Sequence, residues 1–211
     1  LDLPGHGGSG LDVGNGSVPE LADAVLAVLD TLDISKAHFV GHSLGGAICL
    51  FLAIKHSARV SSTSLVCPGG LGSEINLNFI DGFISADRRK EMKAVLGDLF
   101  ADAGAVQRKM IEETLRYKRL DGVPGALDRI RQANFSDDGQ APGRRDALPA
   151  LKGPLQVIWG AEDKISPAAH LDDLPPAIET HLIKGAGHMP HMEKASDTNR
   201  FIGDFVNRVG G

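Results

Sequence analysis

The chain has 211 residues, 42% of them hydrophobic, which fits one domain with a buried core and excludes a disordered chain. Its formal net charge is -5, from 22 basic and 27 acidic residues, so there is no positive surplus to favour nucleic acid as a partner. No apolar run reaches the ~20 residues of a membrane helix, and the two cysteines, Cys49 and Cys67, exclude a disulfide framework and favour a cytoplasmic location.

Helix-like and strand-like segments alternate along the chain, which predicts an α/β fold with a mostly parallel sheet and flanking helices. The first helix is expected after Ser17, whose spacing to Glu20 is that of a capping box. A strand is predicted over residues 37–40 and a second over 60–67. Between them, residues 44–56 are apolar almost all round, which predicts a helix buried on several sides.

Residues 71–152 follow a different pattern, because they contain no clear strand. Helical periodicity with many charges predicts helices over 87–100 and 106–120, and the polar stretch 134–145 is predicted to be a loop. Strands return over 155–159 and 178–183, with a helix after Pro167 and a last helix over 192–209. The expected division is a core of residues 1–70 and 153–211 that carries a helical cap of residues 71–152.

The strongest local pattern is Gly-His-Ser-Leu-Gly at residues 41–45, between a predicted strand and a predicted helix. This is G-x-S-x-G in the context of a nucleophile elbow, where a sharp turn holds the serine, here Ser43, in a strained conformation. Glycine at positions 41 and 45 is expected to avoid collisions around the turn. The N–H of Leu44 would donate to an oxyanion. A glycine-rich turn that only packs a helix on a sheet is the alternative interpretation.

A serine nucleophile needs a base and an orienting acid, which follow it in the order acid, then histidine. Asp163 follows the strand that ends at residue 159, and His188 follows the next predicted strand. Both therefore lie at carboxyl ends of strands, where α/β folds collect their sites. We expect Asp163 as the acid and His188 as the base. Glu162 is the alternative acid, because a neighbouring residue could turn in instead, and His191 is the alternative base.

The glycines of residues 5–10 formally match the dinucleotide-binding pattern G-x-G-x-x-G. Such a site requires a helix that opens directly on the glycines, whereas the first predicted helix begins only after Ser17. No dinucleotide, and no other cofactor, is therefore expected.

His188, His191 and Glu193 are close together in sequence and could suggest a metal site. Zinc sites favour other spacings, and no cysteine supports this one, so no metal is expected. His42 stands beside the nucleophile, but its side chain is expected to point away from Ser43 and to have a structural role.

Four stretches in order along the chain resemble the α/β-hydrolase fold family, namely residues 2–9, 41–46, 159–163 and 185–188. In the insertion, residues 68–76, 79–83 and 117–123 are similar to one subgroup. Its members are the α/β-hydrolase-type proteins named as the dihydrolipoamide acetyltransferase component of acetoin dehydrogenase systems. The resemblance implies Ser43 as nucleophile, Asp163 as acid and His188 as base, in an eight-stranded sheet with a helical cap.

The resemblance also implies features that would precede Leu1. Three strands of the family come before this position, together with the loop that supplies the second oxyanion-hole donor. One of those strands lies in the middle of the family's sheet, so a gap is expected in a chain that starts at Leu1. Some members carry a lipoyl domain upstream. The acyltransferases of 2-oxo acid complexes use His-x-x-x-Asp-Gly, a spacing that does not occur here.

These observations predict a serine-triad acyl-transfer enzyme that acts on a small ester or thioester through an acyl-enzyme. Water as acceptor makes it a hydrolase. A thiol such as coenzyme A or dihydrolipoamide makes it an acyltransferase, with other acetoin dehydrogenase components as partners. A non-catalytic binding module on the same fold is a further hypothesis.

Overall fold

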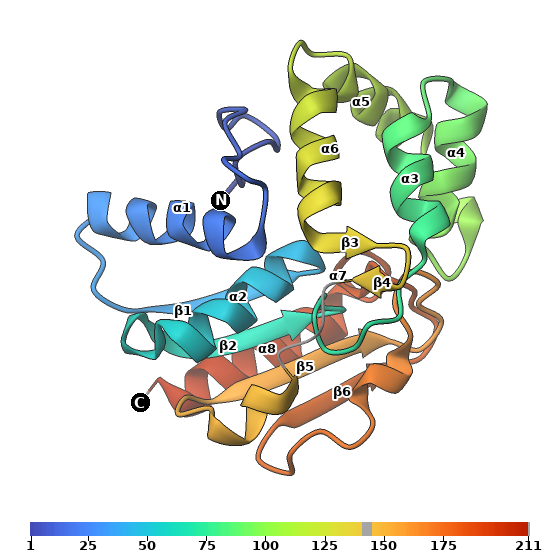
Figure 1. Ribbon diagram of the computed structural model, residues 1–211. Coiled ribbons are helices and arrows are strands. Elements are labelled where there is room, and N and C mark those ends of the chain that lie inside the picture. The colour runs from blue at the N-terminus through green and yellow to red at the C-terminus, as the bar shows by residue number, and fades with distance from the viewer. Residues whose placement is uncertain (141–144, 211) are drawn as a thin grey trace.

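The computed structural model describes residues 1–140 and 145–210, and its centre is a four-stranded parallel sheet (Figure 1). The strands lie in the order β1 (Ala37–His42), β2 (Val60–Val66), β5 (Leu155–Gly160) and β6 (Glu179–Ile183). Helices α1 (Val18–Thr31) and α2 (Leu44–Lys55) lie on one face, and α8 (Ala195–Val209) lies on the other (Figure 1). The predicted α/β class with a parallel sheet and flanking helices is confirmed.

Helix α1 begins where the sequence places it. The Ser17 hydroxyl accepts a hydrogen bond from the N–H of Glu20 at 3.4 Å, which is one half of the predicted capping box. The reciprocal half is replaced, because the N–H of Ser17 donates to Asn15 Oδ1 at 2.9 Å. Helix α2 is buried along most of its length, as its all-round apolar sequence predicts, and Ile48, among others, is almost fully enclosed.

The two central strands are joined by side chains as well as by their ladder. Ser64 of β2 stands opposite Gln156 of β5 in the register of the two strands. The Gln156 amide donates to Ser64 Oγ at 2.8 Å and to the carbonyl of Phe201 in α8 at 3.3 Å. Both Ser64 and Gln156 are fully buried. Two strands and one helix thus share a buried polar contact.

The sheet differs from the eight-stranded one that the resemblance implies. In the described part of the chain the four strands are direct neighbours, so no gap separates them, and β1 and β6 are the edges. Side chains alternate along β1, so Phe39 packs against the core while Val40 is 52% exposed on the opposite face.

Four α-helices follow β2, and we call them together the helical cap: α3 (Leu77–Ser85), α4 (Arg89–Gly97), α5 (Arg108–Lys118) and α6 (Val123–Asn134). They stand above the sheet in Figure 1. The cap has its own hydrophobic cluster, built around the buried side chains of Met92, Leu96, Phe100, Ile111 and Leu115. Helices α4 and α5 were predicted from periodicity, whereas α3 and α6 were not.

The predicted loop 134–145 contains a short hairpin instead, with strands β3 (Phe135–Ser136) and β4 (Gly139–Gln140). Gly139 makes this turn possible, because its φ of 116° is a conformation that residues with a side chain rarely adopt. Residues 141–144 of the predicted loop lie outside the described residues.

Two C-terminal helices also differ from expectation. The helix predicted after Pro167 is a single 3₁₀ turn, Ala168–Leu171. The last helix is divided into α7 (Pro190–Glu193) and α8, because Lys194 between them, with φ -134° and ψ 50°, does not have helical dihedrals. None of the helices in the described residues is long and apolar enough to cross a membrane.

Candidate active site

The turn between β1 and α2 holds Ser43 in a strained conformation, with φ 51° and ψ -117°. For a residue other than glycine this costs about 1–3 kcal/mol, so the surrounding contacts must impose it. The N–H of Ser43 donates to the Val66 carbonyl at 3.0 Å, and the Ser43 carbonyl accepts from Ala47 and Gly69 at 3.0 Å each. The Ser43 hydroxyl makes no capping bond to α2. The backbone is therefore fixed while the hydroxyl stays available.

Of the two positions where glycine was expected, packing requires it at Gly41 but not at Gly45. A Cβ on Gly41 would lie 2.3 Å from the Gly45 carbonyl oxygen, so this residue must be glycine. The expectation for Gly45 is wrong, because a Cβ there would meet nothing within 4 Å. The second crowded position is Gly46, where a Cβ would lie 2.7 Å from Pro68. Glycine is required at position 46 because helix α2 approaches the turn at Pro68 closely, and not because of the turn at Ser43.

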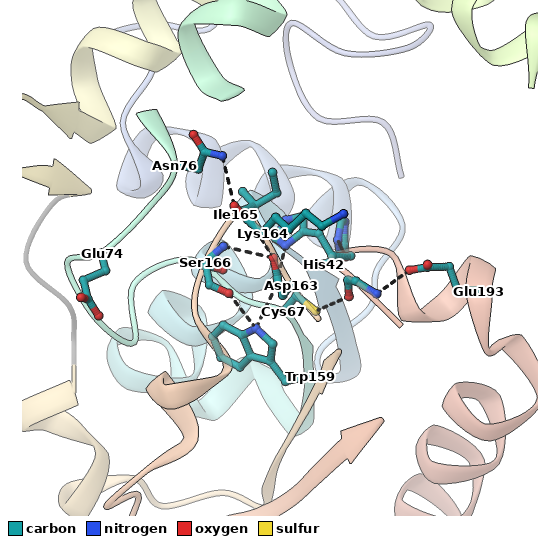
Figure 2. A network of polar contacts seen from close by, with 12 residues as sticks. His42, Cys67, Glu74, Asn76, Trp159, Asp163, Lys164, Ile165, Ser166 and Glu193 are labelled. Atoms are coloured by element: carbon teal, nitrogen blue, oxygen red, sulfur yellow. Dashed lines mark hydrogen bonds and ion pairs between the residues drawn. The ribbon is translucent and has the colours of Figure 1, made fainter. Parts of the chain in front are cut away.

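Asp163 and His188 meet at the carboxyl-terminal edge of the sheet. His188 Nδ1 lies 2.7 Å from Asp163 Oδ2, and their side chains are 3% and 0% exposed. Asp163 Oδ2 also accepts from the Trp159 indole at 3.0 Å, and Oδ1 accepts from the N–H groups of Ile165 and Ser166 at 2.8 and 3.1 Å (Figure 2). Burial opposes ionisation, but the bonds from His188 and the two backbone N–H groups outweigh it and lower the pKa of Asp163.

An ionised Asp163 accepts hydrogen bonds only, so His188 carries a proton on Nδ1. His188 and Ser43 line the same cavity. In the described part of the chain, no hydrogen bond joins the Ser43 hydroxyl to His188. Catalytic hydrogen bonds are often long in ligand-free enzymes and shorten when substrate binds.

The two alternative residues have other partners. Glu162 Oε2 accepts from the N–H of Ala186 at 3.0 Å, so this carboxylate braces the loop before His188. The His191 ring packs on His42 with centroids 4.6 Å apart, and burial lowers the pKa of His191. The structure thus brings Asp163 rather than Glu162 to His188.

The His42 side chain lies against His188. It lines the same cavity as Ser43, and its Nε2 lies 2.7 Å from the backbone carbonyl of His188. Burial, with the neighbouring His188 and His191, lowers the pKa of His42 to about 3. The ring is therefore neutral at pH 7, and its Nε2–H donates to that carbonyl. This contact, made where the loops that follow β1 and β6 converge, fits the structural role expected for His42.

Two of the three residues first considered as metal ligands are otherwise engaged. Both carboxylate oxygens of Glu193 accept backbone N–H groups, and His188 Nδ1 is bonded to Asp163. Within the described residues, Cys67, Asp163 and His188 place ligand atoms within 4.8 Å of one another. This trio does not suit a metal, because burial raises the pKa of the Cys67 thiol and Asp163 already accepts four hydrogen bonds.

Two residues near Asp163 and His188 were not identified in the sequence analysis. Trp159 donates directly to Asp163, and an indole four residues before this aspartate was the available signal. Cys67 follows β2 directly with a positive φ of 40°, and its Sγ lies 3.9 Å from the Gly187 carbonyl. Nothing in the local sequence indicated either the strain or the contact, because Gly187 is distant in the chain.

The cavity beside Ser43 and His188 has a volume of about 530 Å³. Most of its wall comes from the cap and is apolar, with contributions from Ile75, Phe79, Ile80, Phe83, Leu127 and Ile130. Two of its polar residues are already paired: the Asn134 amide donates to the carbonyls of Gly16 and Ile130, and Gln140 accepts from the N–H of Gly70. The cavity is therefore suited to hold an apolar group beside Ser43 and His188.

Leu44 is the first residue of α2 and lines this cavity. The first N–H groups of a helix have no partner inside the helix and carry a partial positive charge. The Leu44 N–H is accordingly suited to stabilise a negative oxygen beside Ser43.

Comparisons with known proteins agree with this geometry. A family model described as the alpha/beta hydrolase fold matches residues 1–195. The dihydrolipoyllysine-residue acetyltransferase component of the acetoin cleaving system of Cupriavidus necator is 43% identical over 204 residues, which is 96% of this chain and 54% of that protein. The protein of the same name from Pseudomonas putida is 42% identical over 208 residues, 99% of this chain and 55% of that protein. The chain thus spans about half the length of these relatives.

Hydrolases are also similar to the chain. A 2-hydroxy-6-oxononadienedioate/2-hydroxy-6-oxononatrienedioate hydrolase of Burkholderia vietnamiensis is 28% identical over 220 residues, which is 99% of this chain and 75% of that protein. The solved structure of a meta-cleavage product hydrolase from Pseudomonas fluorescens has a TM-score of 0.86 and 20% identity, and the match covers 98% of this chain and 78% of that one. At this identity the structural likeness concerns the fold.

Proposed function

Because this chain belongs to the α/β-hydrolase fold family, we propose that it is a serine-triad acyl-transfer enzyme, with Ser43 as nucleophile, His188 as base and Asp163 as acid. One observation carries this proposal: the 2.7 Å hydrogen bond from His188 Nδ1 to a buried, ionised Asp163, beside a cavity that Ser43 also lines. In the proposed organisation, residues 1–70 and 153–211 form the hydrolase core, and residues 71–152 form the cap.

Acylation begins when His188 Nε2 takes the proton of Ser43 Oγ as this oxygen attacks the carbonyl carbon of an ester or thioester. The carbonyl π electrons move to the oxygen, which the Leu44 N–H stabilises. The intermediate collapses, and the leaving alcohol or thiol takes the proton from His188. Asp163 stays ionised and holds the imidazolium by its Nδ1–H. The products of this half-reaction are an acyl-Ser43 ester and a neutral His188.

Deacylation repeats these steps with a second nucleophile. Water or a thiol gives its proton to His188 Nε2 and attacks the acyl carbonyl, and Ser43 Oγ leaves and takes the proton back. We place the second oxyanion donor in a segment that would precede Leu1, as in the family. Hydrolysis of a small ester or thioester is the activity we favour, because the site as described requires no acceptor other than water.

A second candidate is acyl transfer to a thiol such as dihydrolipoamide or coenzyme A. The observation that favours it is the 42–43% identity to relatives named as acetyltransferase components of the acetoin cleaving system. Under this alternative, other components of such a system are the partners. The two activities differ only in the acceptor that resolves the acyl-enzyme.

Covalent labelling tests the proposed triad. Incubation with a fluorophosphonate, followed by peptide mass spectrometry, should give one adduct, on Ser43. A non-catalytic binding module on this fold would give no adduct, and an adduct on another serine would contradict the assignment. Incubation with an acetyl thioester then separates the acceptors: free acetate indicates hydrolysis, whereas acetyl-dihydrolipoamide, formed when dihydrolipoamide is added, indicates transfer.

A further inference from the structure

The Glu193 carboxylate joins the loop that carries His188 to the helical cap. Its Oε2 accepts from the N–H of Gly187, the residue before His188, at 2.7 Å (Figure 2). Its Oε1 accepts from the N–H of Ala101, between α4 and α5, at 2.8 Å. Hydrogen bonds to a charged acceptor are stronger than neutral ones. One side chain thus fixes two backbone segments that are remote in sequence.

Lys164 holds the same cap segment from the loop of the acid. It follows Asp163 directly, and its Nζ donates to the carbonyls of Phe100 and Ala101 at 3.1 and 3.3 Å. The backbone of Lys164 is fixed in turn, because its carbonyl accepts from the Asn76 amide at 3.1 Å (Figure 2). The cap segment 99–101 is therefore hydrogen-bonded to the loop that carries Asp163 and to the loop that carries His188.

Packing ties the base to this segment as well. A Cβ on Gly187 would lie 2.7 Å from the Ala101 nitrogen and 2.8 Å from the Phe100 carbonyl carbon, so the two backbones are in direct contact. Met189, on the other side of His188, packs against the hydrophobic cluster of the cap. Leu99 and Met189 both line the cavity. A ligand that fills the cavity therefore touches both the cap segment and the base loop.

We propose that Glu193, Lys164 and the cap segment 99–101 form a clamp that positions His188 and Asp163 for proton transfer. Glu193 and Lys164 are positioning residues, since neither lines the cavity. The clamp couples the placement of the cap to the geometry of the base. This inference rests on the proposed triad, in which a displacement of ~1 Å costs about 10²-fold in rate.

The first test is Glu193→Gln, which keeps the shape of the side chain but replaces one accepting oxygen with an amide that cannot accept. The matched control is Glu113→Gln, because among the described residues Glu113 pairs only with Lys109 and Arg116, on the surface of α5. Ester turnover is measured well below the melting temperature of each variant. We expect Glu193→Gln to lower kcat by roughly 10–10²-fold with little change in KM, and the control to resemble the parent protein.

A second readout reports on the base without any turnover. In the proton NMR spectrum, the His188 Nδ1–H that bonds Asp163 should give a strongly deshielded resonance. Glu193→Gln should shift or broaden it, whereas Glu113→Gln should leave it in place. If the parent protein shows neither turnover nor fluorophosphonate labelling, the proposed function fails, but this resonance still tests the clamp. An unchanged resonance in Glu193→Gln would overturn the clamp.

Lys164→Met provides an independent variant if Glu193→Gln folds poorly. It should also lower kcat more than KM, since Lys164 holds the same segment from the other loop. In the double variant the two losses should not multiply, because both side chains act on one segment. Independent, multiplicative losses in kcat would contradict a joint clamp. A kcat loss that disappears on cooling would also contradict it, because such a loss follows the fraction of unfolded protein.

Discussion

The two halves of the proposed site are held in different ways. Asp163 and His188 are fixed by side-chain hydrogen bonds, with four donors on the Asp163 carboxylate and His42 bonded to the backbone of His188. Ser43 is fixed by its backbone, in a turn whose φ of 51° the neighbouring glycines permit. The acid–base half therefore depends on polar chemistry, whereas the nucleophile half depends on sterics, and substitutions should affect the two halves differently.

The largest expected effect follows from removing the nucleophile. Ser43→Ala should lower kcat for an ester by ~10⁶-fold and abolish fluorophosphonate labelling, because no other group can form the acyl-enzyme. Its fold should persist, since the Ser43 hydroxyl makes no capping bond. Circular dichroism and labelling measure the two outcomes, and residual labelling at a second serine would place the nucleophile elsewhere.

The acid–base half should respond next. Asp163→Asn should lower kcat by roughly 10⁴-fold, because an amide no longer fixes the His188 tautomer. Glu162→Gln is the neighbouring control, and its effect should be small, since the hydrogen bonds of Glu162 are to the backbone of Ala186. Steady-state kinetics of the two variants show which of the two carboxylates is the acid. The reverse ranking would move the acid to Glu162.

The steric half should be sensitive at one glycine and tolerant at the other. Gly41→Ala places a methyl 2.3 Å from the Gly45 carbonyl oxygen, and overpacking of this kind costs about 1–3 kcal/mol or more. Gly45→Ala fills open space within α2, where alanine is favoured over glycine by about 0.5–1 kcal/mol. Urea unfolding of both variants gives the comparison. Equal destabilisation would show that the elbow is not held by the contact at Gly41.

Acid should weaken the polar half through His42. Its pKa is about 3 in the folded protein against an ordinary value of 6.5, so between these pH values the unfolded chain binds a proton that the folded chain does not. Unfolding free energy must then fall as the pH falls, by about 2 kcal/mol from this residue at pH 5. His42→Gln should reduce the difference in unfolding free energy between pH 7 and pH 5 by this amount. An unchanged difference would mean that His42 is not buried as a neutral ring.

The sequence predicted most of the sheet but little of the cap, for a physical reason. Strand β5 is largely apolar and ends at Gly160, and Pro68 follows closely after strand β2. The elbow is signalled by the G-x-S-x-G pattern between a predicted strand and a predicted helix. Helix α6 begins with Gly122, Pro124 and Gly125 nearby, which weakens every local helical signal. It forms because Ile130 and Ala126 pack on the core beside α1, a contact between distant segments.

The same limit applies to the site. Ser43, Asp163 and His188 could be placed because each follows a strand and parallel strands share one edge. The bond from Glu193 to Ala101 joins residues 92 positions apart, and the His42 contact to His188 spans 146. No periodic or local sequence pattern indicates such contacts, so they can be identified only in the folded structure.

The buried contact between Gln156 and Ser64 has a consequence for how the chain acquires activity. If β5 slipped against β2 by one residue, the side chains would exchange faces and the Gln156 amide would lose its partner, at a cost of about 1–3 kcal/mol. The same slip would carry Asp163 along the strand direction by about 3.3 Å, beyond reach of His188. Chains with the slipped register of β5 would have the native helix content but no catalytic activity. The buried amide of Gln156 therefore favours the native register of β5 against β2 over the slipped one.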